Sequence, residues 1–546
     1  MSSLVAFVEA TRFMNAAGVS NTTIAEQVEY ATAVLAHQML DALRQIDAQD
    51  FETDQATVDV FAHTSAAFAH GMGGGGRRVD DHGDGGPFRT SRSSRAGREV
   101  ARCTAHALVE LTTTTHKTSR RTMGIDSSRA AFKRTQGSLA AGVSSGLRRA
   151  MQPVPLFVER AVGAHVWDLD GDRYIDYVMA WGPLVHGHSD VHIIDAVQRV
   201  VSSMQVVGMG HRLEYEAAEA VLDAVPGAER LVWANTGTEA VQVALRLARA
   251  ATSRRRIVKM TKAYHGWHDS VYASVDAGDT GETAVPASRG QSPNAYADLV
   301  ISQFNDIDSI CRLLEDAEER EIAAVLVDPI MSNAGVLEPR DGFLATLREL
   351  CDRHGVILIF DEVITGFRIA RGGAAERFGV TPDLSVFGKA IAGGFTQSAV
   401  VGKAEIVDLV TDGVMHAGTF NGNPVALAAV KASMELCAAP HMYSRLDDLG
   451  AAFEKEIGAV LTEAGTGSSL RTVGSLLQFV PGDDQATSLH GTGGLWSGIS
   501  AAMLEAGVVF TPSGKIFLST AHSPADIRQT ADRLADALRV ISVPST

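Results

Sequence analysis

Two side chains that can do chemistry follow two short apolar runs in the middle of the chain. Asp361 comes directly after VILIF (356–360), and Lys389 comes two residues after LSVF (384–387). Continuous apolar runs of this length are typical of strands that are buried on both faces, as in a parallel sheet. Because ligands bind beyond the carboxyl ends of such strands, we expect Asp361 and Lys389 to lie at one crevice.

A lysine in such a crevice can form a Schiff base with a carbonyl, provided that partial burial of its ammonium lowers its pKa. An aspartate beside it can keep a pyridinium nitrogen protonated, as pyridoxal 5'-phosphate (PLP) requires when it acts as an electron sink. Taken singly, each residue has a plainer interpretation, with Asp361 as a helix cap and Lys389 as a solvated loop residue. Three longer motifs favour the catalytic interpretation.

These motifs are DEVITGFR (361–368), GKAIAGG (388–394) and GTFNGNP (418–424). Together they resemble class III PLP-dependent aminotransferases, and within that family they look most like the glutamate-1-semialdehyde 2,1-aminomutases. The resemblance runs from about residue 126 to the C-terminus. It implies the α/β architecture of PLP-dependent transferase fold type I, with a large domain built on a mostly parallel sheet and a smaller α+β domain. The alternation of strands and helices through 228–405 also favours a mostly parallel sheet covered on both faces.

A phosphate-binding turn is expected within ERLVWANTGTEAVQVALRLAR (229–249). An apolar run ends at Ala234, and Thr238 opens a helix, so the turn at Gly237 exposes N–H groups at a helix N-terminus. The resemblance assigns Gly237 and Thr238 to the cofactor phosphate, and Thr419 to the phosphate of the neighbouring subunit. If Thr419 acts in this way, each site contains residues of two chains, and the protein is a homodimer.

The resemblance also assigns side chains to the cofactor ring. Tyr264 matches the aromatic residue that stacks on the ring, although a core tyrosine is the alternative. Asn333 matches a residue that hydrogen-bonds the ring hydroxyl, and Val363 belongs to the same set of cofactor-binding residues. Asp328 ends the apolar run AAVLVDP (323–329), where the family usually has glutamate.

Three residues are expected on the substrate. Arg148, in GVSSGLRR (142–149), matches an arginine that binds the substrate carboxylate bidentately, with a surface arginine as the alternative. Trp181 of WGP is expected near the substrate, unless it is a core residue. Lys515 lies in PSGKIF (512–517), which is shorter than the corresponding family loop and carries a lysine where an acid is typical. Its charge would favour a second carboxylate, whereas a solvent-facing side chain would have no such role.

Two more departures from the family pattern concern substrate handling. After Lys389 the chain reads GGFTQSAVVG (393–402), where aminomutases tend to have a proline. The flexible segment that gates the site is only loosely matched, by residues 275–290.

Composition limits the class of partner. The chain has 546 residues and a formal net charge of −16, which disfavours nucleic acid and anionic membranes as partners. The four cysteines have no paired spacing, so we expect neither a disulfide framework nor a metal site. The N-terminus lacks the features of a signal peptide, and no apolar stretch reaches the length of a membrane span, so we expect a cytoplasmic protein.

The expected domain organisation has five parts: a helical N-terminal extension (1–70), a flexible linker (71–125), the first part of the small domain (126–210), the PLP-binding large domain (211–430) and the second part of the small domain (431–546). Thr23 and Glu26 fit a capping box at the start of a helix in the extension. The Gly-, Ser- and Arg-rich composition of residues 71–98 is typical of a linker.

We expect an aminotransferase that acts on a small carboxylate-bearing amino or carbonyl substrate through a Schiff base on Lys389. The first alternative is a glutamate-1-semialdehyde 2,1-aminomutase, which moves the amino group within one molecule to make 5-aminolevulinate. A second alternative, from a different class, is a non-catalytic scaffold that docks partners through residues 1–70. Such a scaffold could dispense with Lys389 or Asp361, and both are present.

Overall fold

The protein is described here from a computed structural model, which covers residues 124–275, 282–482 and 494–541. The expected N-terminal extension, almost all of the expected linker and residues 276–281 of the expected gating segment lie outside these ranges. Within them, no helix is long and apolar enough to cross a membrane.

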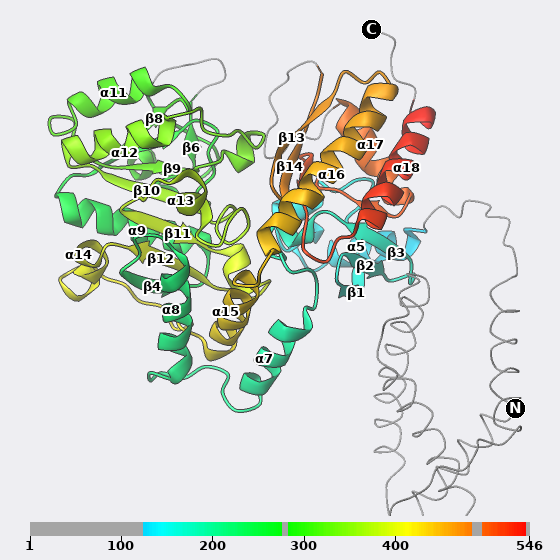
Figure 1. The fold of residues 1–546 in the computed structure, drawn as a ribbon, viewed down its shortest axis with the longest axis horizontal. Helices are drawn as coiled ribbons and strands as arrows, with labels where there is room; N and C mark the ends of the chain where they lie inside the picture. The colour runs from blue at the N-terminus through cyan, green and yellow to red at the C-terminus, as the bar shows by residue number, and fades with distance from the viewer. Residues whose placement is uncertain (1–123, 276–281, 483–493, 542–546) are drawn as a thin grey trace, which may run out of the picture. The chain divides into compact units, whose positions relative to one another are not determined.

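A seven-stranded sheet forms the centre of the large domain (Figure 1). In spatial order its strands are β4 (Arg230–Ala234), β12 (Ser398–Gly402), β11 (Leu384–Phe387), β10 (Ile357–Glu362), β9 (Ile322–Val327), β5 (Arg256–Met260) and β8 (Leu299–Ser302). Only β12 is antiparallel to its neighbours β4 and β11. The mostly parallel sheet expected from the sequence is therefore confirmed.

Helices cover both faces of this sheet, which explains why its strands are mostly apolar. Alternate residues of β10 show the two faces: Ile359 packs with α9 (Gly237–Thr252), whereas Leu358 and Phe360 pack with residues of α11 and α12. The sheet therefore has no solvated face, and the exposed polar chemistry is confined to the strand ends.

The remaining helices of the large domain surround the same core. They are α8 (Arg212–Ala224), α10 (Pro293–Tyr296), α11 (Ile307–Glu315), α12 (Phe343–His354), α13 (Gly373–Phe378), α14 (Ala404–Val407) and α15 (Pro424–Cys437). The two-stranded sheet of β6 (Ala273–Ser274) and β7 (Val285–Pro286) lies beside residues 276–281, which are not described.

The smaller α+β part joins both ends of the described chain. The antiparallel hairpin of β2 (His165–Asp168) and β3 (Arg173–Asp176) forms around the turn Asp170-Gly171-Asp172, and β3 pairs in parallel with β15 (Val508–Val509). That pairing brings residues near the start and the end of the family resemblance into one sheet.

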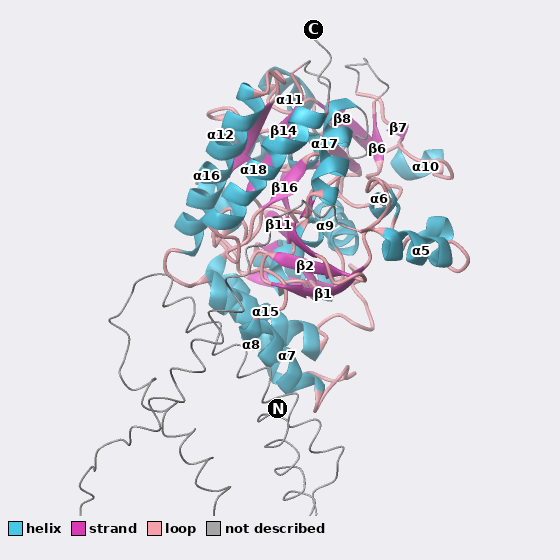
Figure 2. Cartoon of the chain, turned by 90° about the vertical axis from the view of Figure 1, so that its right-hand side faces the viewer, coloured by secondary structure: helices cyan, strands magenta, loops and turns pink. Residues whose placement is uncertain are grey.

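The other elements of this part are β1 (Val158–Val162), β13 (Ser469–Val473), β14 (Leu476–Val480), β16 (Lys515–Phe517), α5 (Asp126–Thr135), α6 (Gly146–Arg149), α16 (Met442–Glu463), α17 (Gly494–Glu505) and α18 (Pro524–Val540). Helices α16, α17 and α18 pack over β13 and β14 (Figures 1 and 2).

The domain boundaries expected from the sequence stay predictions, but one helix bears on them. α7 (Val191–Val201) falls in the expected small domain, yet its buried residues Ile193 and Val197 share a core with Leu427 of α15 and Ala217 of α8. This packing favours a boundary before α7 rather than at residue 210.

One fully buried arginine ties the two parts together. Arg368 follows β10, and its guanidinium donates to the carbonyls of Gly182 and Leu518 and to the hydroxyl of Ser475. Burial lowers its pKa to about 10. Arg368 therefore stays charged and is held by neutral acceptors from three distant segments.

Candidate active site

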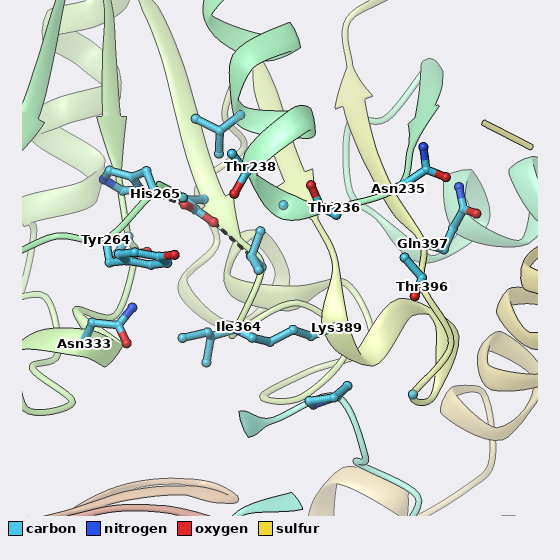
Figure 3. A pocket seen from close by; sticks show the side chains of 18 of the residues that line it. Asn235, Thr236, Thr238, Tyr264, His265, Asn333, Ile364, Lys389, Thr396 and Gln397 are labelled. Carbon is cyan, nitrogen blue, oxygen red and sulfur yellow. Dashed lines mark hydrogen bonds and ion pairs between the residues drawn. The ribbon is translucent and has the colours of Figure 1, made fainter. Parts of the chain in front are cut away.

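A cavity of about 260 Å³ lies at the carboxyl ends of the large sheet. Its walls include seven residues expected at the cofactor: Gly237, Thr238, Tyr264, Asn333, Asp361, Val363 and Lys389. Figure 3 shows Tyr264, His265 and Asn333 on one side of the pocket, Asn235, Thr396 and Gln397 on the other, and Lys389 between them. The topology of the sheet therefore brings together these seven residues, which span 152 positions of the sequence (237 to 389).

Lys389 is placed by the end of β11. After Phe387 the chain passes Gly388, and Lys389 itself has a φ of 46°, a conformation that is costly for a residue with a side chain. Burial lowers the pKa of the Lys389 ammonium to about 8, although the carboxylates of Asp361 and Asp328 raise it. A fraction of this lysine is therefore an uncharged amine near neutral pH, the form that attacks a carbonyl.

Asp361 is the penultimate residue of β10, and its carboxylate is held at both oxygens. Oδ1 accepts a hydrogen bond from the N–H of Val363, and Oδ2 lies 2.6 Å from Nδ1 of His265. Because a carboxylate only accepts, His265 carries its proton on Nδ1 and donates it to Asp361. Burial lowers the pKa of His265, so the ring is neutral and its Nε2, which has no partner among the described residues, is an acceptor.

The neighbouring acid, Glu362, has a structural role. Its carboxylate accepts hydrogen bonds from the N–H groups of Ala374 and Ala375, at the start of α13, and from the hydroxyl of Thr365. Burial raises the pKa of Glu362 to about 7, against the effect of these hydrogen bonds. Of the two adjacent acids, only Asp361 faces the pocket.

A second buried carboxyl group, that of Asp328, lies at the end of β9. Burial and the nearby Asp361 carboxylate raise the pKa of Asp328 well above its usual value. Behind it, the ammonium of Lys259 donates to the carbonyls of Ala263, Val271 and Ala273, and burial lowers its pKa to about 8. Lys259 therefore fixes both ends of the loop that carries Tyr264 and His265.

His265, Asp328 and Asp361 also offer a set of ligand atoms that lie within 4.8 Å of one another, as a divalent cation would need. The shortest contact in this set is the hydrogen bond from His265 to Asp361. Because the same carboxylate also accepts from a backbone N–H, we interpret the set as a group that orients Asp361 rather than as a metal site.

The N-terminus of α9 forms the opposite wall. Thr236 caps the helix, and a reciprocal hydrogen bond from its backbone to Glu239 completes a capping box. The N–H groups of Gly237 and Thr238 come next, and the first N–H groups of a helix have no intrahelical acceptor. The positive end of the helix dipole therefore faces the pocket, where it can stabilise a bound phosphate.

Two close approaches explain why glycine occurs on both sides of this helix start. A Cβ on Gly237 would lie 3.0 Å from a methyl group of Val363, and a Cβ on Gly266 would lie 2.7 Å from the hydroxyl oxygen of Thr238. Gly266 also has a φ of 95°. The phosphate-binding turn and the loop of Tyr264 are therefore packed against each other without space for a side chain.

Tyr264 and Asn333 line the pocket next to His265 (Figure 3). The ring of Tyr264 meets Tyr272 edge-on at 6.0 Å between centroids, and burial raises its pKa. Asn333 accepts a hydrogen bond of 2.6 Å at Oδ1 from the ammonium of Lys515. Lys515 is 7% exposed and lies in β16, so the alternative in which it points to solvent from a loop is wrong.

The residues expected on the substrate do not line the cavity. Arg148 is exposed on α6, and Trp181 packs with the core cluster of Val166 and Tyr174, whereas Pro183, two residues later, lines the pocket. Among the described residues, Asn333 is the cavity residue to which Lys515 donates a hydrogen bond. Their roles in substrate binding stay predictions.

Thr419 is exposed and lies outside the pocket of its own chain. Its loop is nevertheless fixed to the pocket rim, because the amide of Asn235 donates to Oδ1 of Asn421 over 2.9 Å. This arrangement leaves Thr419 free to face another molecule.

Sequence reasoning missed His265, although it had selected the adjacent Tyr264. The signal that could have indicated His265 was its position next to Tyr264, which was already expected to stack on the cofactor ring near Asp361. It also overlooked Gln397, which lies in the pocket wall with its Nε2 bonded to the carbonyl of Ala234.

Comparisons with known proteins agree with this geometry. A sequence model of the family described as aminotransferase class-III matches residues 147–538. The chain is 36% identical to a glutamate-1-semialdehyde 2,1-aminomutase of Sulfurihydrogenibium azorense over 434 residues, 77% of this chain and all of the relative. It is 38% identical to the protein of the same name from Salinibacter ruber over 424 residues, 76% of this chain and 96% of the relative.

Solved structures give the same result. A transaminase with PLP bound has a TM-score of 0.71 and 29% identity, covering 77% of this chain and 98% of that one. An omega-transaminase from Sphaerobacter thermophilus has a TM-score of 0.69 and 33% identity, covering 78% and 98%. A glutamate-1-semialdehyde aminomutase from Pseudomonas aeruginosa PAO1 has a TM-score of 0.68 and 25% identity, covering 76% and 94%.

Proposed function

This chain belongs to the class III aminotransferase family and is a PLP-dependent enzyme, and we propose that it moves an amino group to or from a small carboxylate-bearing carbonyl or amino substrate. The observation that carries the proposal is the half-buried Lys389, with its lowered pKa, in the same pocket as the Asp361–His265 pair. A lysine that is partly uncharged and a carboxylate that faces the pocket are the two groups that this chemistry requires.

The described residues fit PLP. The cofactor has a phosphate, a ring nitrogen, a ring hydroxyl and an aldehyde, and each finds a matching group: the start of α9, Asp361, Asn333 and Lys389. Tyr264 offers an aromatic face, and Val363 packs on the opposite part of the wall beside Gly237. The absence of a Cβ on Gly237 lets the start of α9 pack closely against Val363.

Bound PLP would withdraw electrons from the substrate carbon that bears the amino group, so that its proton becomes acidic. Lys389 would then take this proton as a general base and return a proton as a general acid. Asp361 would hold the proton on the ring nitrogen, while His265 keeps the Asp361 carboxylate in place. Arg148 would bind the substrate carboxylate, and Trp181 would lie near the substrate.

We also propose that the enzyme is a homodimer in which Thr419 binds the phosphate at the neighbouring site. Exposed apolar side chains near both pocket-forming loops support a second copy of this chain as the partner. Trp267, which follows the turn of Tyr264, is 74% exposed, and Phe420, next to Thr419, is 56% exposed. Burial of these two side chains against a second copy of this chain would remove apolar surface from water.

A second candidate is a glutamate-1-semialdehyde 2,1-aminomutase, because curated relatives at 36–38% identity carry that name. The two reactions place different demands on the pocket. A transaminase must release its first product and admit a second substrate, whereas an aminomutase must retain the half-converted molecule until the amino group returns.

The test is to mix PLP-loaded enzyme with glutamate alone and to follow the visible absorbance together with release of 2-oxoglutarate. We expect stoichiometric release of the keto acid with glutamate or another amino donor. If no donor gives any release, and glutamate-1-semialdehyde is rapidly converted to 5-aminolevulinate, the aminomutase is correct.

The variant Thr419→Ala tests the dimer. We expect Thr419→Ala and Lys389→Ala each to be inactive alone. Mixing the two variants should restore activity, because each heterodimer then has one site with both Lys389 and Thr419 intact.

A further inference from the structure

A second lysine is buried next to the pocket, at a position where the family resemblance leads one to expect an acid. Lys515 begins β16, and its backbone is fixed on both sides. It pairs with Gln478 of β14, and its carbonyl accepts a hydrogen bond from the hydroxyl of Thr511. Its ammonium donates to Oδ1 of Asn333 over 2.6 Å. The side chain is therefore held at one place and aimed at one pocket residue.

The chemistry of these two groups fixes the orientation of the Asn333 amide. An amide has a carbonyl end that accepts and an amino end that donates, whereas an ammonium has three donors and no acceptor. When Lys515 is protonated, only the carbonyl end of Asn333 can face it, so Nδ2 of Asn333 points away from Lys515. Because Asn333 lines the cavity, the amino end is then available to the pocket as a donor.

The charges around Lys515 are consistent with a role beyond packing. Lys389 and Asp328 are the charged groups that act on it: burial and the Lys389 ammonium lower the pKa of Lys515 to about 7, and Asp328 raises it. Keeping two lysines near each other in a buried place is costly, and a nonpolar residue would avoid the cost. The hydrogen bond from Lys515 to Asn333 is the favourable interaction that offsets part of this cost.

We propose that Lys515 is a positioning residue that acts through Asn333: it holds the amide with Nδ2 toward the pocket, so that the ring oxygen of bound PLP meets a donor. This inference rests on the proposed function and adds the residue that sets the polarity of the Asn333 contact. A donor stabilises the anionic form of that oxygen. The oxygen then holds less tightly the proton that it shares with the nitrogen linking Lys389 to the cofactor.

The experiment measures the pH midpoint of the visible absorbance change of the PLP-loaded enzyme, with Lys515→Met, Lys515→Gln, Asn333→Ala and the double variant Asn333→Ala/Lys515→Met. Methionine has similar length but no donor, whereas glutamine is uncharged and can still donate to Asn333. Lys455→Met, at an exposed position of α16, is the control. Circular dichroism and bound PLP are recorded for each variant.

We expect Lys515→Met to raise the midpoint by about one pH unit, which corresponds to the loss of one hydrogen bond to a charged oxygen. Lys515→Gln should stay near the wild type, and Asn333→Ala should shift like Lys515→Met. Adding Lys515→Met to Asn333→Ala should cause no further shift, because the residue through which Lys515 acts is gone.

Two results would overturn the inference. If Lys515→Gln shifts the midpoint as much as Lys515→Met, and the double variant shifts further than Asn333→Ala, the lysine acts by its charge alone. If the midpoint is unchanged but KM for a dicarboxylate donor rises, Lys515 contacts substrate instead. Should Lys515→Met not fold, the Gln and Asn333→Ala variants decide between the same outcomes. A wild-type protein that shows no visible PLP band would refute the proposed function itself, independently of Lys515.

Discussion

The residues expected at the cofactor and those expected on the substrate come from different parts of the molecule. On the cofactor side, Lys389, Asp361, Tyr264 and the start of α9 all lie at strand ends of one seven-stranded sheet. On the substrate side, the expected residues Arg148, Trp181 and Lys515 come from outside that sheet, and none lines the cavity. Strand order fixes the first set as soon as the sheet forms. The position of the second set depends on how the smaller α+β part packs against the sheet.

The strongest test of the cofactor side is Lys389→Ala. The variant should fold, because its side chain faces a cavity, but turnover should fall by several orders of magnitude, as removal of a covalent catalyst usually causes. Borohydride reduction of wild-type enzyme followed by mass spectrometry should find the pyridoxyl group on Lys389. Lys455→Ala is the matched control, and finding the label on another lysine would refute the assignment.

Asp361→Asn should have the next largest effect. A neutral amide cannot stabilise a protonated ring nitrogen, so removal of the substrate proton should slow by roughly a hundredfold or more while PLP stays bound. Single-turnover kinetics with substrate deuterated at that carbon measure this step. Glu362→Gln, which alters the adjacent acid, should reduce thermal stability and leave the step nearly unchanged. Equal slowing in both variants would mean that Asp361 has no special role.

Arg148→Gln tests whether one of the residues expected on the substrate contributes to substrate binding. If α6 contributes to substrate binding, KM for a carboxylate substrate should rise about tenfold with little change in kcat, since one charge-assisted contact is lost. Arg149→Gln, one position later on the same helix, should have no effect. Unchanged KM in both variants would remove α6 from the site and leave the cofactor side as the whole of the predicted pocket.

The smallest effect concerns the pH dependence of stability in the PLP-free protein. Burial lowers the pKa of Lys259 and Lys389 to about 8 and that of Lys515 to about 7, below the value of about 10.4 for an unfolded lysine. Between these pH values the unfolded chain binds more protons, so stability should rise as pH increases from 7 to 10. Thermal unfolding should show a rise of a few degrees that is smaller in Lys515→Met. A fall in Tm over this range would contradict the lowered pKa values of these three lysines.

Sequence predicted the sheet and its chemistry well because both follow from local patterns. The apolar runs before Asp361 and Lys389 are strands β10 and β11, and the turn at Gly237 opens α9. What it could not predict depends on contacts between distant segments. The bond from His265 to Asp361 spans 96 positions, and that from Lys515 to Asn333 spans 182. The residues around a lysine in a short motif do not indicate whether its side chain faces solvent or a buried amide.

Arg368 has a consequence for how the enzyme can move. Its three acceptors lie 107 to 186 positions away in sequence, and no carboxylate of the described residues forms an ion pair with it. If the segment of Leu518 swung away, a buried guanidinium would lose a partner that no nearby group replaces. Opening of that segment should therefore be energetically coupled to unfolding of the region around β10, and we expect the two to exchange amide hydrogens as one cooperative unit.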